Sequence, residues 1–125
     1  MKLRIRDNSL RLRLTQTEVG TLRADGRVTA TTAFPGGASL EYSLECDDDV
    51  AELTASMHDG RITVQVPKAV AHEWADSDRV SLRGDRAFDD GQSLSLLVEK
   101  DFTCLAPREG EDESDMYPHP QAGAG

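Results

Sequence analysis

Five positively charged side chains alternate with apolar residues at the start of the sequence. The alternation falls into two short stretches, and Asp7-Asn8 between them is typical of a tight turn. Side chains two residues apart lie on one face of a strand, about 7 Å from each other. The pattern predicts a β-hairpin with one apolar face and one basic face, the basic one made by Lys2, Arg4, Arg6, Arg11 and Arg13.

This basic face could bind an anion, with DNA as the expected ligand. Guanidinium groups suit phosphate oxygens and guanine edges, and a two-stranded ribbon can enter a major groove. The alternative is a solvated strand face whose charges are offset by Glu41, Glu45 or an acidic C-terminal segment.

Net charge limits the kind of binding that is possible. The 125 residues contain 14 Lys and Arg against 23 Asp and Glu, a formal net charge of -9, which argues against indiscriminate nucleic-acid binding. Residues 1–45 nevertheless carry a net +2, whereas residues 46–106 carry -7 and residues 107–125 carry -4. A local anion site in the first half is therefore compatible with the acidic total.

Residues 107–125 lack periodicity and are rich in Pro, Gly, Ala and acidic residues, so we expect a disordered acidic tail after a single domain over residues 1–106. The alternative function is an antitoxin-like protein-interaction module whose acidic second half and tail bind a basic partner protein. A further hypothesis is that the tail docks onto the basic face of its own chain. The tail acids concerned are Glu109, Glu111, Asp112, Glu113 and Asp115.

Residues that could hold a metal or perform catalysis are scattered. No Cys-x-x-Cys or His-x-x-x-His spacing occurs, and no nucleophile motif, so we expect no metal, no cofactor and no catalytic residue. An enzyme or enzyme subunit remains the weakest of the three function classes. The candidate ligands are His58, His72, His119, Cys46, Cys104 and the aspartates at 47–49, which we expect to form a turn.

No apolar run approaches the roughly 20 residues that a membrane span requires, and the first residues lack the apolar stretch of a signal peptide. We therefore expect a cytoplasmic protein with reduced cysteines and no membrane association.

Both halves of the sequence predict the order strand, strand, helix, strand, strand. In the first half, Thr15 and Glu18 have the spacing of a capping box that starts a helix, which Asp25-Gly26 ends. In the second half, alternation begins at Ala51, Asp59-Gly60 is a hairpin turn, and Pro67 fits the first position of a helix. A short strand at 80–82, a loop over 84–92 and a last strand over 93–102 complete the pattern.

The two halves align as an internal repeat, with repeat 1 over residues 1–46 and repeat 2 over 51–104. A shift of 52 residues places Arg27-Val28 on Arg79-Val80, and a shift of 54 matches the segments beyond. Duplication explains this best, since two units that each leave an apolar face open can close one core by pairing. The chain would then be a monomer that acts as an intrachain pseudo-dimer, or a dimer.

Two motifs resemble known families. The run DNSLRLRL at residues 7–14 resembles the G-N-S-L-x-V-R-I-P strand of MazE-type antitoxins. The run GRITVQVPKAV at residues 60–70, with Asp78-Arg79-Val80 downstream, resembles the G-R-I-T-I-P-K-E-I … G-D-R-V core of AbrB-like regulators. Residues 4–16 also resemble the opening of a small bacterial family from which no function can be carried over.

The resemblance implies an α+β fold in which two ββαββ repeats form one pseudo-twofold, swapped-hairpin β-barrel with two short helices, here in tandem as in MraZ. It also implies a non-enzymatic, DNA-binding regulator that uses the basic N-terminal hairpin. Because the positive residues lie mainly in one half, we do not expect symmetric DNA recognition by two equivalent hairpins.

Overall fold

Eight β-strands and two α-helices make up the part of the chain that the computed structural model describes, residues 1–102, 115 and 117. The first half contains β1 (Lys2–Arg6), β2 (Ser9–Leu14), α1 (Gln16–Asp25), β3 (Arg27–Ala33), the 3-10 turn η1 (Pro35–Gly37) and β4 (Ser39–Cys46). The second half contains β5 (Thr54–His58), β6 (Arg61–Val66), α2 (Lys68–Asp76), β7 (Ser81–Ala87), the 3-10 turn η2 (Asp89–Gly91) and β8 (Ser93–Lys100). The α+β class and the predicted element order of both halves are confirmed.

The strands form two four-stranded sheets, and each sheet combines a hairpin from either half. Sheet A has the order β1-β2-β8-β7 and sheet B the order β3-β4-β6-β5. The central pairs, β2 with β8 and β4 with β6, are parallel. Within the described residues the outer strands of each sheet are hydrogen-bonded on one side only, so the predicted closed barrel is not seen.

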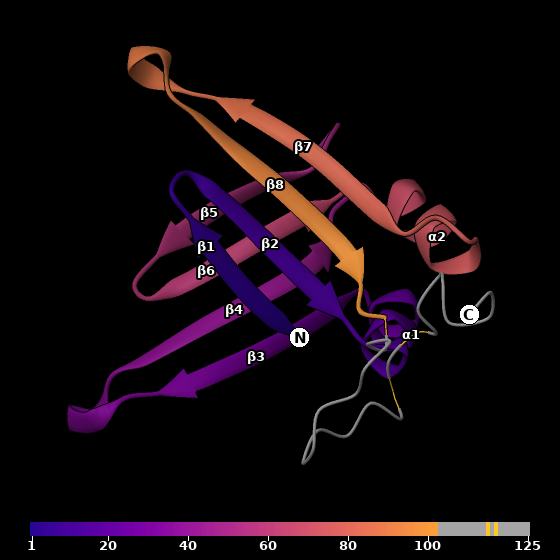
Figure 1. Cartoon of the computed structure of the whole chain (residues 1–125), viewed down its shortest axis with the longest axis horizontal. Coiled ribbons are helices and arrows are strands. Elements are labelled where there is room, and N and C mark those ends of the chain that lie inside the picture. Colours follow the sequence, from indigo (N-terminus) through magenta and orange to yellow (C-terminus); the bar gives the residue numbers. More distant parts are fainter. Residues whose placement is uncertain (103–114, 116, 118–125) are drawn as a thin grey trace, which may run out of the picture.

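The apolar core lies between the two sheets, whose strands cross in two layers (Figure 1). In the central strands alternating residues point inward and are buried, as the period of two requires, whereas no residue of the edge strands β1 and β5 is fully buried. The helices lie side by side at one end of the layers and contribute Val19, Leu22, Ala71 and Trp74 to the core. Trp74 is the largest of these side chains and is 0% exposed.

Helix ends follow the local chemistry of the sequence. At the start of α1 the Glu18 N–H donates to Thr15 Oγ1 over 3.4 Å and the Thr15 N–H donates to Glu18 Oε1 over 2.9 Å, which is the predicted capping box. Gly26 ends this helix with φ +79°, a conformation that glycine adopts without strain. Helix α2 begins at Lys68, one residue later than predicted, because Pro67 is its N-cap. Both helices in the described part of the chain are too short and too polar to cross a membrane.

Strand register relates the two halves more closely than their sequences do. Lys2 pairs with Arg13 in the first hairpin, and Thr54 pairs with Gln65 in the second, a shift of 52 residues. Strands β3 and β4 correspond to β7 and β8 with a shift of 54 residues. Every residue on one sheet therefore has a register equivalent on the other.

Some predicted boundaries in the second half are wrong. Arg27 corresponds to Ser81 and not to Arg79, because the Trp74 indole N–H donates to the Val80 carbonyl oxygen over 2.9 Å and holds this connection beside α2. Residues 84–87 belong to β7 and not to a loop, since their backbone pairs with β8. The alternation from 51 gives a strand only from residue 54, and β8 ends at residue 100.

Candidate functional site

The outer face of sheet A gathers the predicted basic residues. Arg4 lies opposite Arg11 and Lys2 lies opposite Arg13 across the β1–β2 hairpin. In the same register, residues 95, 97 and 99 of β8 and residues 81, 83 and 85 of β7 share this face. The face thus has a sixth cation, and the basic face now comprises Lys2, Arg4, Arg6, Arg11, Arg13 and Arg83.

Arg83 comes from the second half of the chain and was missed by the sequence analysis. Gly84 and Asp85 follow it, and both residue types are depleted in strands, which favoured a loop. Continuous pairing of β7 with β8 overrides this preference and places Arg83 on the basic face.

At one end of the basic face two carboxylates offset most of the charge of three cations. Glu99 Oε1 accepts hydrogen bonds from Arg11 Nε over 2.6 Å and from Arg13 Nε over 2.7 Å. Glu99 is only 9% exposed and lies opposite Arg13 in the β2–β8 ladder. Lys2 Nζ lies 3.2 Å from Asp101 Oδ2. We call this part the paired end.

The acidic residues that neutralise the paired end are not the predicted ones. Glu41 pairs with Arg61 over 3.2 Å, and Glu45 lies 3.8 Å from Arg27. These pairs belong to the outer face of sheet B, because β4 is a strand of that sheet. Glu41 and Glu45 therefore cannot offset the hairpin that β1 and β2 form.

At the other end, Arg4, Arg6 and Arg83 have no ion pair with any residue that the structure describes. A hollow of about 350 Å³ lies among these three side chains and Arg11. Its other lining residues include Leu97 and Asp85. We call this part the open end, and arginines from strands β1, β2 and β7 line its one small volume.

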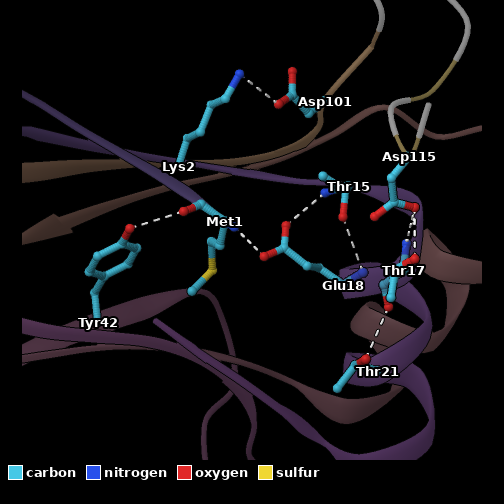
Figure 2. A network of polar contacts seen from close by, with 9 residues as sticks. All are labelled: Met1, Lys2, Thr15, Thr17, Glu18, Thr21, Tyr42, Asp101 and Asp115. Atoms are coloured by element: carbon cyan, nitrogen blue, oxygen red, sulfur yellow. Dashed lines mark hydrogen bonds and ion pairs between the residues drawn. The ribbon is translucent and has the colours of Figure 1, made fainter. Parts of the chain in front are cut away.

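The tail contacts α1 through Asp115 (Figure 2). Asp115 Oδ1 accepts hydrogen bonds from the Thr17 N–H over 3.0 Å and from Thr17 Oγ1 over 2.7 Å, and its carbonyl oxygen accepts from the Gln16 N–H over 2.9 Å. Hydrogen bonds from the Thr15 and Thr17 side chains lower the pKa of the Asp115 carboxyl. Asp115 thus binds the positive end of a helix dipole and not the basic face.

Tyr117 continues this contact. Its N–H donates to the Asp101 carbonyl oxygen over 2.7 Å, and its ring centroid lies 5.5 Å from that of Phe102. Lys100 Nζ lies 5.4 Å from the Tyr117 ring centroid and 5.7 Å from that of Trp74. Burial lowers the pKa of Lys100 and raises that of Tyr117. The other predicted tail acids, Glu109, Glu111, Asp112 and Glu113, lie outside the described residues.

The candidate metal ligands are spread over the fold. The described residues contain no group of three or more His, Cys, Asp or Glu side chains that could hold a metal ion. Asp47 forms the predicted turn, since its carboxylate accepts from the Asp49 N–H over 2.8 Å and from Gln65 Nε2 over 2.8 Å. Cys46 is a half-buried free thiol whose pKa is raised by burial. His119 and Cys104 lie outside the described residues.

Comparison with known proteins places the chain in a family. A model of a family of unknown function, DUF7009, matches residues 1–121. The chain belongs to this family. No curated protein matches the chain, and no solved structure does. Membership in DUF7009 assigns no activity, so the function has to be argued from the basic face.

Proposed function

We propose that this DUF7009 protein is a non-enzymatic binding protein, and that its ligand is DNA held by the basic face. The observation that carries the proposal is the open end, where Arg4, Arg6 and Arg83 lie around one hollow without an ion pair to a described residue. Exposed arginines without partners are available for phosphate oxygens, which they bind with planar, forked geometry.

The shape of the site supports a nucleic-acid ligand. Strands β1 and β2 form one edge of the four-stranded sheet A, where β2 also pairs with β8, and the side chains of β-strands can contact the grooves of duplex DNA. The chain carries a net charge of -9, so affinity for DNA has to arise from this local surface. Binding is then one-sided, in agreement with the expectation from the charge distribution.

We also propose that the two halves are related by a pseudo-twofold axis, as in the swapped-hairpin fold of AbrB-like and MazE-like proteins. Two observations support this: each sheet combines hairpins from both halves, and the halves have equivalent register. A regulator of this kind would act in the cytoplasm, where Cys46 would stay a free thiol.

Fluorescence anisotropy with a labelled duplex DNA pool at low salt tests the proposal. We expect the wild-type protein to bind, and Arg4→Ala with Arg6→Ala to weaken binding about tenfold. Loss of two phosphate contacts should also reduce the slope of log K against log salt by about 2. No binding by the wild-type protein at low salt would contradict the proposal.

The matched control is Arg27→Ala with Arg61→Ala. It removes the same number of arginines, but from the outer face of sheet B, where both are paired with glutamates. Measured in 0.1 M salt, its DNA affinity should stay within about twofold of wild type, because charges farther from the bound DNA than the Debye length of about 10 Å are largely screened. An equal loss in both double variants would show that net charge alone is responsible.

A further inference from the structure

We propose that the hollow at the open end binds a terminal phosphate group, that is, a phosphate monoester dianion. The inference deepens the proposed function and rests on the same basic face. It adds a ligand chemistry, because an internal phosphate of DNA is a monoanionic diester whereas an end phosphate is a monoester.

The positions of the arginines favour a single compact anion. Arg4 and Arg6 come from the edge strand β1, Arg83 comes from β7, and the hollow lies over the two strands between them. Arginines that line a hollow of about 350 Å³ from the two opposite edges of one sheet face can surround a tetrahedral phosphate. A row of donors along one strand would instead follow an extended backbone.

The net charge of the side chains that line the hollow is opposite in sign and similar in size to the charge of a dianion. Arg4, Arg6 and Arg83 contribute three positive charges without described partners, and the carboxylate of Asp85 also lines the hollow. The charge of Arg11 is already shared with Glu99. The remaining net charge of about +2 balances the charge of about -2 that a phosphate monoester carries above its second pKa of about 6.

Two serines line the hollow, but neither has a free hydroxyl proton to donate to a bound anion. Ser9 Oγ donates to the Arg6 carbonyl oxygen over 2.6 Å, and Ser95 Oγ donates to Asp85 Oδ1 over 2.9 Å. Their protons are therefore committed within the protein. Guanidinium groups must supply the contacts to the anion, so recognition depends on charge and on the arginine fork.

The size of the hollow limits what it can enclose. A volume of about 350 Å³ is at the lower end of the roughly 300–1,000 Å³ typical of small-molecule sites. It accommodates a phosphate group, while the rest of a phosphorylated ligand extends over the basic face. Leu97 in the lining offers an apolar contact to the carbon atom that carries the ester.

The fold itself does not dictate this group of three arginines. The register equivalents of Arg4, Arg6 and Arg83 on sheet B are Ser56, His58 and Thr29. The same backbone therefore carries hydroxyl and imidazole groups where sheet A carries three arginines. The convergence of arginines is specific to one face, as expected for a binding site.

The test compares one duplex oligonucleotide with 5′-phosphate ends and with 5′-hydroxyl ends, and adds inorganic pyrophosphate as a competitor. We expect the phosphorylated duplex to bind at least fivefold more tightly, and pyrophosphate to remove this advantage. Arg83→Ala should weaken binding of both duplexes, because it removes one phosphate contact, but it should weaken binding of the phosphorylated duplex more, so that the fivefold advantage disappears. Arg83→Lys, which keeps the charge but loses the fork, should restore only part of it.

The control variant is Arg86→Ala on the same strand. Arg86 Nη1 lies 3.0 Å from Glu52 Oε1 and does not line the hollow, so the fivefold preference should persist. Equal affinities of the wild-type protein for the two duplexes would overturn the inference, and so would equal losses in Arg83→Ala and Arg86→Ala.

The outcomes for the two proposals are separable. If the hydroxyl duplex binds and the end phosphate adds nothing, this inference fails and the proposed DNA binding stands. If the hydroxyl duplex does not bind but pyrophosphate does, measured by calorimetry with an Arg83→Ala control, DNA binding fails and the phosphate site stands.

Discussion

Sheets A and B present outer faces with the same strand register and opposite chemistry. The central row of sheet A is Arg4, Arg11, Leu97 and Arg83, and the equivalent row of sheet B is Ser56, Thr63, Ser43 and Thr29. On sheet B, Thr29 Oγ1 and Ser43 Oγ lie 3.2 Å apart and satisfy each other. On sheet A, the guanidinium groups of Arg4 and Arg83 have no ion pair with any of the described residues.

The two sheets therefore share one scaffold, whereas the candidate binding site lies only on the outer face of sheet A. The buried residues that form the core are apolar in both sheets, because they share one core. Outward residues are free of this constraint, so one face could acquire cations while the other remained nearly neutral. The outer face of sheet B therefore serves as an internal control for every claim about the basic face.

The largest expected effect is on stability, and it comes from removing the glutamate that pairs with arginines on each outer face. Glu99→Ala should lower the free energy of unfolding by about 2 kcal/mol, since it removes charged hydrogen bonds to Arg11 and Arg13 from a nearly buried site. Glu45→Ala should cost less than about 1 kcal/mol, because its pair with Arg27 is exposed and 3.8 Å long. Urea denaturation of both variants checks this, and equal losses would contradict the distinction.

A second difference lies at the inner positions Gly84 and Ala30, which are register equivalents. A Cβ on Gly84 would lie 3.0 Å from Leu53 Cβ and 3.2 Å from the Leu53 carbonyl oxygen. Gly84→Ala should therefore destabilise the protein by about 1–2 kcal/mol through overpacking. Ala30→Gly should cost at most about 1 kcal/mol. Thermal unfolding distinguishes them, and a stabilising Gly84→Ala would show that the contact relaxes freely.

Transplanting the arginines tests whether their position on the sheet is sufficient. Ser56→Arg with His58→Arg places two guanidinium groups at the sheet B equivalents of Arg4 and Arg6. In the Arg4→Ala, Arg6→Ala background we expect this change to recover DNA affinity to within about threefold of wild type. Anisotropy measures the recovery. No recovery would mean that sheet A contributes features beyond charge and register.

The smallest expected effect is on the paired end. Glu99→Gln keeps the shape of the side chain but releases the charges of Arg11 and Arg13, so DNA affinity should rise about threefold at low salt. Glu45→Gln is the control on sheet B and should change affinity by less than 1.5-fold. A decrease in affinity for Glu99→Gln would indicate that Glu99 positions the arginines for binding.

Much of the difference between the two outer faces was predictable from the sequence, because the alternation of apolar and charged residues along a strand is a local pattern. The period of two placed Lys2, Arg4, Arg6, Arg11 and Arg13 on one face, and the turn residues at 7–8 and 59–60 set the hairpins. The capping box of α1 is equally local. The closed barrel, suggested by resemblance, is not seen in the described residues, where the outer strands of each sheet pair on one side only.

What the sequence could not reveal depends on contacts between distant segments. Glu99 is 88 residues from Arg11 and reaches it through the parallel pairing of β2 with β8. Arg83 lies next to Gly84 and Asp85, so its strand is imposed by pairing with β8 and not by residue preference. The division of the basic face into a paired end and an open end is therefore a tertiary property.

The most direct test of the account maps bound DNA onto the two faces. In a titration of the ¹⁵N-labelled full chain with a short duplex, followed by NMR, we predict the largest shift changes at the backbone amides and Arg Nε–H groups of residues 4, 6, 11 and 83. Signals of the sheet B equivalents 29, 56, 58 and 63 should change little. Shift changes centred on sheet B, or spread equally over both faces, would contradict the assignment of binding to the basic face.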